Sequence, residues 1–225
     1  MSLTLEAPIE IETAPNPTLS VIWMHGLGAD GNDFPPIIPE LKLPKDAAIR
    51  FIFPHAPMMP VTCNNGYVMR AWFDILSMAG GTRDVNPDTV VASVELVRGL
   101  IKKENERGIP SNRIVLAGFS QGGAMTYTVG LTYPETLGGM MVLSGYIPTP
   151  AWVEKNVQEA NRHTPIFAAH GTHDDVLPIA LGESARDLAQ KLNDKVEWHS
   201  WPMPHTLCLE EVLAMGEWLS ARLNK

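Results

Sequence analysis

The sequence predicts an α/β fold in which a mostly parallel central sheet is covered by helices on both faces. Short runs of strand-forming residues are apolar throughout instead of alternating with polar residues, as expected for parallel strands buried on both faces. Helical patterns separate these runs along the chain, which is typical of a doubly wound sheet. The 225 residues, 45% of them hydrophobic, contain no linker and no internal repeat. We therefore expect a single domain over residues 1–225.

Seven runs have the length and composition of strands, and the first of them is the weakest. They lie at residues 9–12, 19–24, 49–53, 114–117, 140–143, 166–169 and 196–201. Five other stretches have helical spacing of apolar residues, namely 88–107, 121–133, 150–161, 179–192 and 207–223. In the first of these, Val90, Val94 and Ile101 fall on one helical face, and Asn86-Pro87 suits the start of a helix.

Charge and cysteine content restrict the partners and the location that we expect. A net charge of −8 argues against nucleic acid as a partner, because phosphate binding requires clustered lysine and arginine. The stretch MSLTLEAPIEIETAP lacks the basic and apolar regions of a secretory signal, and no apolar run approaches the ~20 residues of a membrane span. Cys63 and Cys208 are too few for a disulfide framework. The sequence thus predicts a cytoplasmic protein with no stable membrane span.

One serine lies between glycines at a junction of a strand and a helix. Residues 118–122, Gly-Phe-Ser-Gln-Gly, follow the strand-like run 114–117 and precede the helical stretch 121–133. This is the G-x-S-x-G pattern of a nucleophile elbow, in which a tight turn lifts the serine hydroxyl above the sheet. An ordinary glycine-rich turn is the alternative, but the position between a strand and a helix favours Ser120 as a nucleophile.

A serine hydroxyl needs a base to remove its proton and a carboxylate to orient that base. In this fold the acid and then the base follow the serine along the chain. Asp174 and Asp175 both follow the strand-like run 166–169 and could supply the acid. For the base, His205 lies in a loop before a helix, whereas His199 lies inside a strand-like run, so His205 is favoured. Without Ser120, a helix cap and a solvated loop histidine would explain these residues equally well.

The transition state also requires hydrogen-bond donors for its oxyanion. One donor is expected from the backbone N–H of Gln121, the residue after the candidate nucleophile. The second is expected from an early loop, and the stretch His25-Gly26-Leu27-Gly28 after the run 19–24 is similar to the oxyanion loop of hydrolases. The N–H of Leu27 would then be the second donor. A tight turn in this loop is compatible with that role, because the turn would aim the amide.

Several blocks of the sequence together resemble one family. They are VIWMHGLGADGNDF, FPHAPMMPVTCNNGYVMRAWFDI, LAGFSQGGAM, LSGYIP, HGTHDDVLP and MPHTLCLEE. These are similar, in the same order, to the blocks of the phospholipase/carboxylesterase group of α/β-hydrolases, which includes acyl-protein thioesterases and small bacterial carboxylesterases. The resemblance implies an α/β-hydrolase fold without a cofactor or metal, and a small ester or acylated molecule as substrate. The family contains dimers, so a homodimer is one oligomeric state that the resemblance implies.

The resemblance also assigns roles to residues. It implies that Ser120 is the nucleophile and His205 the base. It favours Asp174 over Asp175 as the acid, because the family's acid stands three residues after the glycine that Gly171 matches. It further implies that the backbone amides of Leu27 and Gln121 form the oxyanion hole.

Other functions remain as alternatives. A metal-dependent hydrolase could use His170, His173, Asp174 and Asp175 as Zn²⁺ or Mn²⁺ ligands, although such a site leaves Ser120 unexplained. A non-catalytic binding protein on the hydrolase fold is a second alternative, and such proteins usually lack a member of the triad. A peptidase or lactonase is a nearer rival among serine hydrolases.

The segment 58–78 combines many large apolar residues with prolines, asparagines and a glycine, which predicts a loop. A long apolar loop in a compact domain is more often a binding loop or lid than a plain connection. We expect at least one of its aromatic residues to lie in the core and the rest to line a groove for the acyl chain. The residues assigned to this groove are Met69, Trp72, Phe73 and Leu76.

Overall fold

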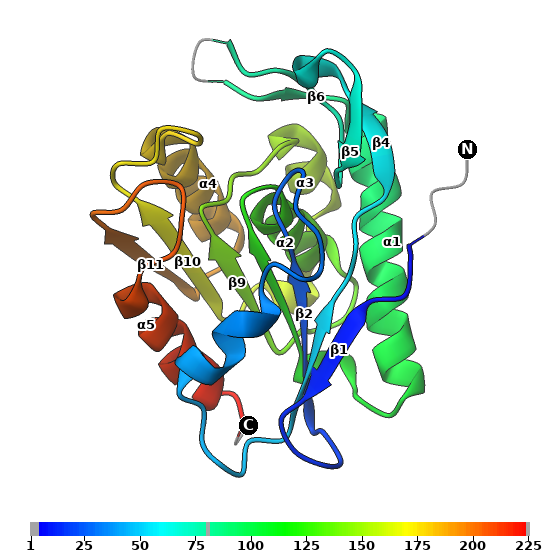
Figure 1. Cartoon of the computed structure of the whole chain (residues 1–225), viewed down its shortest axis with the longest axis vertical. Coiled ribbons are helices and arrows are strands. Elements are labelled where there is room, and N and C mark those ends of the chain that lie inside the picture. The colour runs from blue at the N-terminus through cyan, green and yellow to red at the C-terminus, as the bar shows by residue number, and fades with distance from the viewer. Residues whose placement is uncertain (1–4, 80–81, 224–225) are drawn as a thin grey trace.

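The computed structural model describes residues 5–79 and 82–223, so the ends of the expected domain, 1–4 and 224–225, lie outside the described residues. Its main sheet has seven strands in the order β1 (Ile9–Glu12), β3 (Ile49–Phe53), β2 (Leu19–Met24), β8 (Ile114–Phe119), β9 (Gly139–Leu143), β10 (Ile166–Gly171) and β11 (Val196–Trp201). β1 pairs antiparallel with β3, and every other neighbouring pair in this sheet is parallel. The predicted mostly parallel sheet is confirmed (Figure 1).

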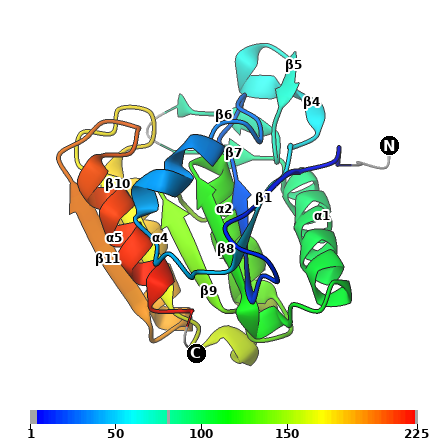
Figure 2. The same ribbon diagram turned by 60° about the horizontal axis from the view of Figure 1, so that its bottom comes forward.

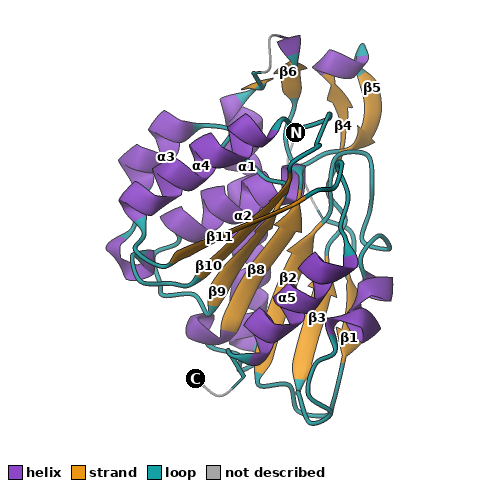
Figure 3. Ribbon diagram, turned by 90° about the vertical axis from the view of Figure 1, so that its left-hand side faces the viewer, coloured by secondary structure: helices purple, strands orange, loops and turns teal. Residues whose placement is uncertain are grey.

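Helices cover both faces of this sheet. They are α1 (Pro87–Glu106), α2 (Gln121–Thr132), α3 (Pro150–Asn156), α4 (Ile179–Leu192) and α5 (Leu209–Ser220). Alternate residues of β2 face opposite ways: Ile22 and Met24 pack with α1 and α2, whereas Val21 and Trp23 pack with α5. Figure 3 shows α5 on one side of the sheet and α1 to α4 on the other. No helix in the described ranges is long and apolar enough to cross a membrane.

Short 3-10 helices connect several of these elements. They are η1 (Pro35–Leu41), η2 (Thr62–Asn64), η4 (Ser111–Arg113) and η5 (Glu159–Asn161). η1 packs against α5 so closely that a Cβ added to Gly216 would lie 1.8 Å from the Leu41 carbonyl oxygen. Glycine at this position therefore allows η1 and α5 to cover the same face of the sheet.

Some boundaries differ from the prediction. The third helix ends at Asn156 and not at residue 161, because the chain becomes extended at Val157 and Asn161 is held by tertiary contacts. The Asn161 side chain donates to the carbonyls of Tyr133 and Glu135 and accepts from the Leu137 N–H. β8 and β10 each run two residues further than predicted, because they stay paired with their neighbours to their carboxyl ends.

The segment predicted as a loop, 58–78, instead forms strands of two small antiparallel sheets. One is the hairpin of β4 (Met58–Val61) and β5 (Tyr67–Arg70), and the other pairs β6 (Ile75–Ser77) with β7 (Asp84–Val85). The turn of the first hairpin explains the residues that suggested a loop, since Asn65 and Gly66 both have positive φ there (55° and 72°). Figure 2 shows both hairpins at one end of the main sheet.

Candidate active site

Ser120 lies in a tight turn between β8 and α2. Its φ of 56° and ψ of −116° are unusual for a residue with a side chain. Two glycines make the turn possible. A Cβ on Gly118 would lie 2.2 Å from the Gly122 carbonyl oxygen, and a Cβ on Gly122 would lie 2.1 Å from the Met24 carbonyl oxygen. The glycines are therefore required by packing, and they present the Ser120 side chain at the carboxyl end of the sheet.

His205 connects the serine to a carboxylate. Its Nε2 lies 2.9 Å from Ser120 Oγ and its Nδ1 lies 2.6 Å from Asp174 Oδ2. The other Asp174 oxygen accepts hydrogen bonds from the N–H groups of Val176 (3.0 Å) and Leu177 (2.7 Å). Burial alone would raise the pKa of Asp174, but the hydrogen bonds from His205 and Leu177 outweigh it and hold the pKa below its usual value. A carboxylate in this position can orient the imidazole, which in turn can take the serine proton.

The other two candidates for acid and base lie apart from this chain of hydrogen bonds. Asp175 is exposed next to Asp174. His199 lies in β11, where its ring stacks against Phe167 (4.6 Å between centroids) and Trp201 (5.6 Å). The structure therefore brings Ser120, Asp174 and His205 together, and it does not bring Asp175 or His199 to them.

The early glycine-containing loop is organised by a buried histidine. Because the Ala56 N–H donates to His25 Nε2 (3.0 Å), the proton resides on Nδ1, which donates to the Gly26 carbonyl (2.7 Å). Burial lowers the pKa of His25 to about 4, so the ring is neutral at physiological pH. Within the described part of the chain, neither the Leu27 N–H nor the Gln121 N–H donates to another group, and both residues line the cavity beside Ser120.

The Gln121 side chain has a structural role that was not predicted from the sequence. Its Oε1 accepts from the Trp72 N–H and its Nε2 donates to the Phe73 carbonyl, both at 2.7 Å. The Trp72 indole N–H in turn donates to the His25 carbonyl (3.0 Å). These bonds join the nucleophile turn, the segment before β6 and the oxyanion-loop candidate. In the sequence, this role is indicated only by the polar residue Gln121 in the turn between Gly118 and Gly122.

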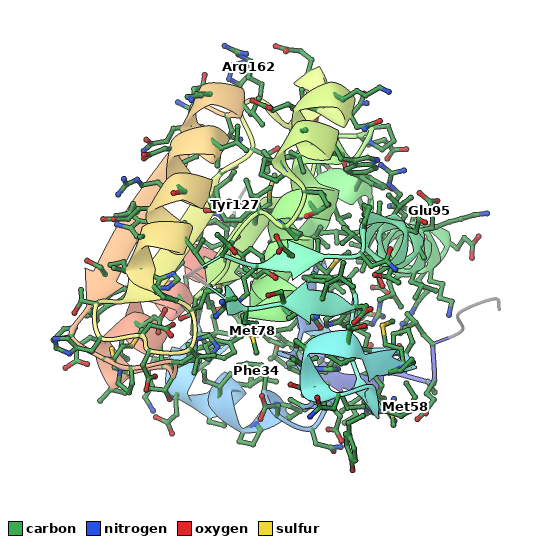
Figure 4. The ribbon with its side chains drawn as sticks, turned by 90° about the horizontal axis from the view of Figure 1, so that it is seen from above. Phe34, Met58, Met78, Glu95, Tyr127 and Arg162 are labelled. Carbon is green, nitrogen blue, oxygen red and sulfur yellow. The ribbon has the colours of Figure 1, made fainter. Side chains whose placement is uncertain are left out.

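A cavity of about 330 Å³ lies beside Ser120. Most of its wall is apolar and comes from separate parts of the chain, with Leu27, Ile75, Met78, Tyr146, Val176 and Leu177 among the lining residues. Arg83, which follows β6 in the same hairpin, donates a hydrogen bond to the Val176 carbonyl. The hairpin and the loop that carries Asp174 thus meet over the cavity. Figure 4 shows Met78 near the middle of this face and Met58 at its edge.

None of the four residues expected in an acyl groove lines this cavity. Trp72 and Phe73 are fully buried in the core, and Met69 packs against the small cluster of Met59, Val61 and Ala71. Leu76 is 43% exposed, whereas its neighbour Ile75 is buried, because successive side chains of a strand point to opposite faces. The expected segment does contribute to the cavity wall, but through Asn64, Ile75 and Met78.

The residues proposed as alternative metal ligands do not form a ligand set. His170 Nε2 lies 2.8 Å from the Leu177 carbonyl oxygen, and both Asp174 oxygens already accept hydrogen bonds. Across residues 5–79 and 82–223 there is no group of three His, Cys, Asp or Glu side chains that could hold a metal ion.

Comparisons with known proteins agree on one family. A family model described as phospholipase/carboxylesterase matches residues 7–223. An acyl-protein thioesterase 1 from Neurospora crassa is 36% identical, over 100% of this chain and 95% of that protein. A probable carboxylesterase from Oryza sativa is 36% identical, over 97% of this chain and 82% of that protein.

Solved structures give the same result. The crystal structure of SOBER1 from Arabidopsis thaliana is similar with a TM-score of 0.85 at 33% identity, and the match covers 91% of this chain and 99% of that one. An acyl-protein thioesterase 2 from Zea mays matches with a TM-score of 0.83 at 24% identity, which supports the fold alone. The chain therefore belongs to the phospholipase/carboxylesterase family of α/β-hydrolases and is a serine hydrolase.

Proposed function

We propose that this protein hydrolyses short- to medium-chain acyl esters through an acyl-enzyme formed on Ser120. The observation that carries the proposal is the chain of hydrogen bonds from Asp174 through His205 to Ser120 Oγ. His205 takes the serine proton as Oγ attacks the carbonyl carbon, and it then protonates the departing alcohol or thiol. Asp174 holds the imidazole with its proton on Nδ1 and stabilises the imidazolium that forms.

The oxyanion would be stabilised by the backbone amides of Leu27 and Gln121. Both residues line the cavity beside Ser120, and Gln121 is the first residue of α2, where the helix dipole favours negative charge. Water then attacks the acyl-enzyme, with His205 as base, and releases the acid. The acyl chain occupies the cavity of about 330 Å³, which is at the small end of the range for ligand pockets and suits chains of short to medium length.

Esters, thioesters and lysophospholipids all react through the same acyl-enzyme, so the triad does not distinguish them. Relatives named acyl-protein thioesterase and carboxylesterase support both ester and thioester substrates for this chain. The test is a panel of p-nitrophenyl esters of graded chain length, run beside acyl-CoA thioesters and lysophospholipids. We expect the highest kcat/KM at a chain of intermediate length. No hydrolysis of any member, with the protein folded, would contradict the proposal.

We include in this proposal the cytoplasmic location and the homodimer expected from the sequence. A cytoplasmic location agrees with the lack of a membrane-spanning helix in the described part of the chain. A homodimer would have twice the 24.7 kDa mass of the chain, which light scattering after size-exclusion chromatography measures directly.

A further inference from the structure

A second cavity, of about 430 Å³, lies next to the first and shares His205, Phe119 and Asp33 with it. Its apolar wall includes Phe34 and Ile37 of the η1 region and Leu207 from the loop after His205, and two carboxylates, Asp33 and Glu40, also line it. We propose that this cavity binds the leaving group of the substrate and favours leaving groups that carry a positive charge. This inference rests on the proposed function.

The position of His205 identifies which part of a substrate each cavity can hold. Ser120, Leu27 and Gln121 line the first cavity and do not line the second, so the acyl carbon can react only in the first. As the C–O or C–S bond breaks, the acyl group stays on Ser120 Oγ and the departing oxygen or sulfur takes the proton from His205 Nε2. The departing group therefore lies on the His205 side, where the second cavity begins.

An aromatic wall gives this cavity an apolar surface. The Phe119 ring lies 4.7 Å from the His205 ring and 6.1 Å from the Phe34 ring, between centroids. Phe34 itself stacks on the buried Trp23 at 5.2 Å. Because Trp23 belongs to β2 of the main sheet, the wall is supported by the core. A leaving group with an apolar body can pack on it.

The charges around the cavity have mainly one sign. Asp33 and Glu40 line it and are exposed to solvent. Partial burial of the Asp33 carboxyl, and to a smaller extent the nearby charge of Asp30, raise its pKa above the usual value. Lys42 Nζ lies 3.1 Å from Glu40 Oε2 and offsets part of that charge. No lysine or arginine is among the described residues that line the cavity. Asp33 therefore contributes most to a preference for cations.

Three thioesters with the same octanoyl group test this proposal. Their thiols are thiocholine, which is cationic; 3,3-dimethylbutanethiol, which has the same shape without the charge; and 2-mercaptoethanesulfonate, which is anionic. We expect kcat/KM to fall in that order for the wild-type protein. In Asp33→Asn, the ratio of kcat/KM for the cationic thioester to kcat/KM for the neutral thioester should fall about fivefold. This is the size expected for one exposed charge pair at contact distance in water. The fall should be smaller in Glu40→Gln, because Lys42 already pairs with Glu40.

Asp46→Asn is the matched control. Asp46 is exposed before β3, at the end of the sheet away from Ser120, so the same loss of charge there should leave the ratio unchanged. The ratio of two substrates on one preparation does not depend on the fraction of protein that is folded. Raising the salt concentration should reduce the preference in the wild-type protein.

Ile37→Trp gives a second, uncharged test, because it fills the cavity from the η1 side. It should lower kcat/KM for the 3,3-dimethylbutyl thioester more than for the smaller methyl thioester of the same acid. Equal kcat/KM for the three charged and neutral thioesters, or the same change in Asp33→Asn and Asp46→Asn, would overturn the inference. If either result came with Ser120-dependent hydrolysis intact, the proposed function would stand.

Discussion

The residues of the hydrogen-bonded chain at Ser120 and the residues that cover the cavity beside it belong to two different kinds of structure. Ser120, Asp174 and His205 lie on loops that leave strands of a seven-stranded sheet with a fully buried centre. The roof comes from two small hairpins whose apolar side chains are partly exposed, such as Tyr67 at 69% and Met78 at 43%. We therefore propose that the large sheet holds the reacting atoms in place, whereas the hairpins mainly select the acyl chain.

The largest expected effect is on the sheet side. Ser120→Ala should lower kcat by a factor of about 10⁴–10⁶, because the nucleophile is lost. The protein should stay folded, since an alanine methyl occupies less space than the side chain it replaces. Ester hydrolysis and a thermal unfolding curve measure the two effects. A variant that kept more than a few per cent of the activity would contradict the role of Ser120.

Asp174→Asn should give the next largest loss. An asparagine cannot hold the imidazole with its proton on Nδ1 and stabilise its positive charge, so kcat should fall by about 10⁴. Asp175→Asn is the control, because this neighbour is exposed and the His205 Nδ1 hydrogen bond goes to Asp174. The two variants compared at one pH separate the roles, and equal losses would show that the assignment of the acid is wrong.

The buried carboxyl group of Glu211 on α5 should make the free energy of unfolding depend on pH. Burial raises the pKa of Glu211 to about 8. In the unfolded chain the group loses its proton near pH 4.5, whereas in the folded protein it keeps the proton until about pH 8. The free energy of unfolding should therefore fall as the pH rises through this window, by on the order of 3–5 kcal/mol.

Glu211→Gln should remove that decline, because the amide has no proton to lose. Glu210→Gln makes the same substitution at an exposed position of the same helix, so the decline with pH should remain in this variant. Urea unfolding at pH 5, 6.5 and 8 measures the difference between the two variants. Parallel curves would mean that Glu211 ionises without a penalty in the folded protein.

A further variant tests the contact between the two regions. Gln121→Ala keeps the backbone amide but leaves the buried Trp72 N–H and Phe73 carbonyl without their hydrogen-bond partner. Each unsatisfied group costs about 1–3 kcal/mol, so the free energy of unfolding should fall by roughly 2–6 kcal/mol. Gln158→Ala, an exposed glutamine, should change it by less than about 0.5 kcal/mol. Similar values for both would mean that the hairpins do not depend on Gln121.

The difference between the main sheet and the two hairpins explains which parts of the structure could be predicted from the sequence. The strands of the main sheet are apolar runs between helices, and the G-x-S-x-G pattern with the chain order of acid and base named the three residues that the structure brings together. The choice of Asp174 over Asp175 needed the family resemblance, because two adjacent carboxylates follow the same strand.

The hairpins could not be predicted residue by residue. Their strands are two to four residues long, which is too short for a pattern. Pro60 within β4 and the asparagines of the turn after it indicated a loop. Which side chains face the cavity depends on the pairing of Ile75 with Val85, a contact that only the folded chain makes. Gln121 holds the backbone of Trp72 and Phe73, whose side chains are buried in the core, and no local pattern indicates these bonds.

The smallest expected effect is a change of acyl-chain preference in the hairpins. Met78 lines the cavity and Leu76 does not, although both side chains are 43% exposed and lie two residues apart. Met78→Asp should therefore lower kcat/KM for octanoyl esters more than for acetyl esters. A buried methylene contributes about 0.8 kcal/mol, so the loss of two such contacts should lower the octanoyl-to-acetyl ratio by roughly 15-fold.

Leu76→Asp is the matched control, since it introduces the same charge two residues away, at an equally exposed side chain that does not line the cavity. If Met78 selects the acyl chain, Leu76→Asp should leave the octanoyl-to-acetyl ratio near the wild-type value. If instead both variants lower kcat/KM equally for the two esters, the hairpin supports the loop of Asp174 through the bond from Arg83 to Val176. A fall of the ratio in Leu76→Asp alone would place the acyl chain on the exposed face of the hairpin, outside the cavity beside Ser120. Because these outcomes differ in the ratio and not only in the rate, one pair of substrates decides between selection of the chain and support of the catalytic loop.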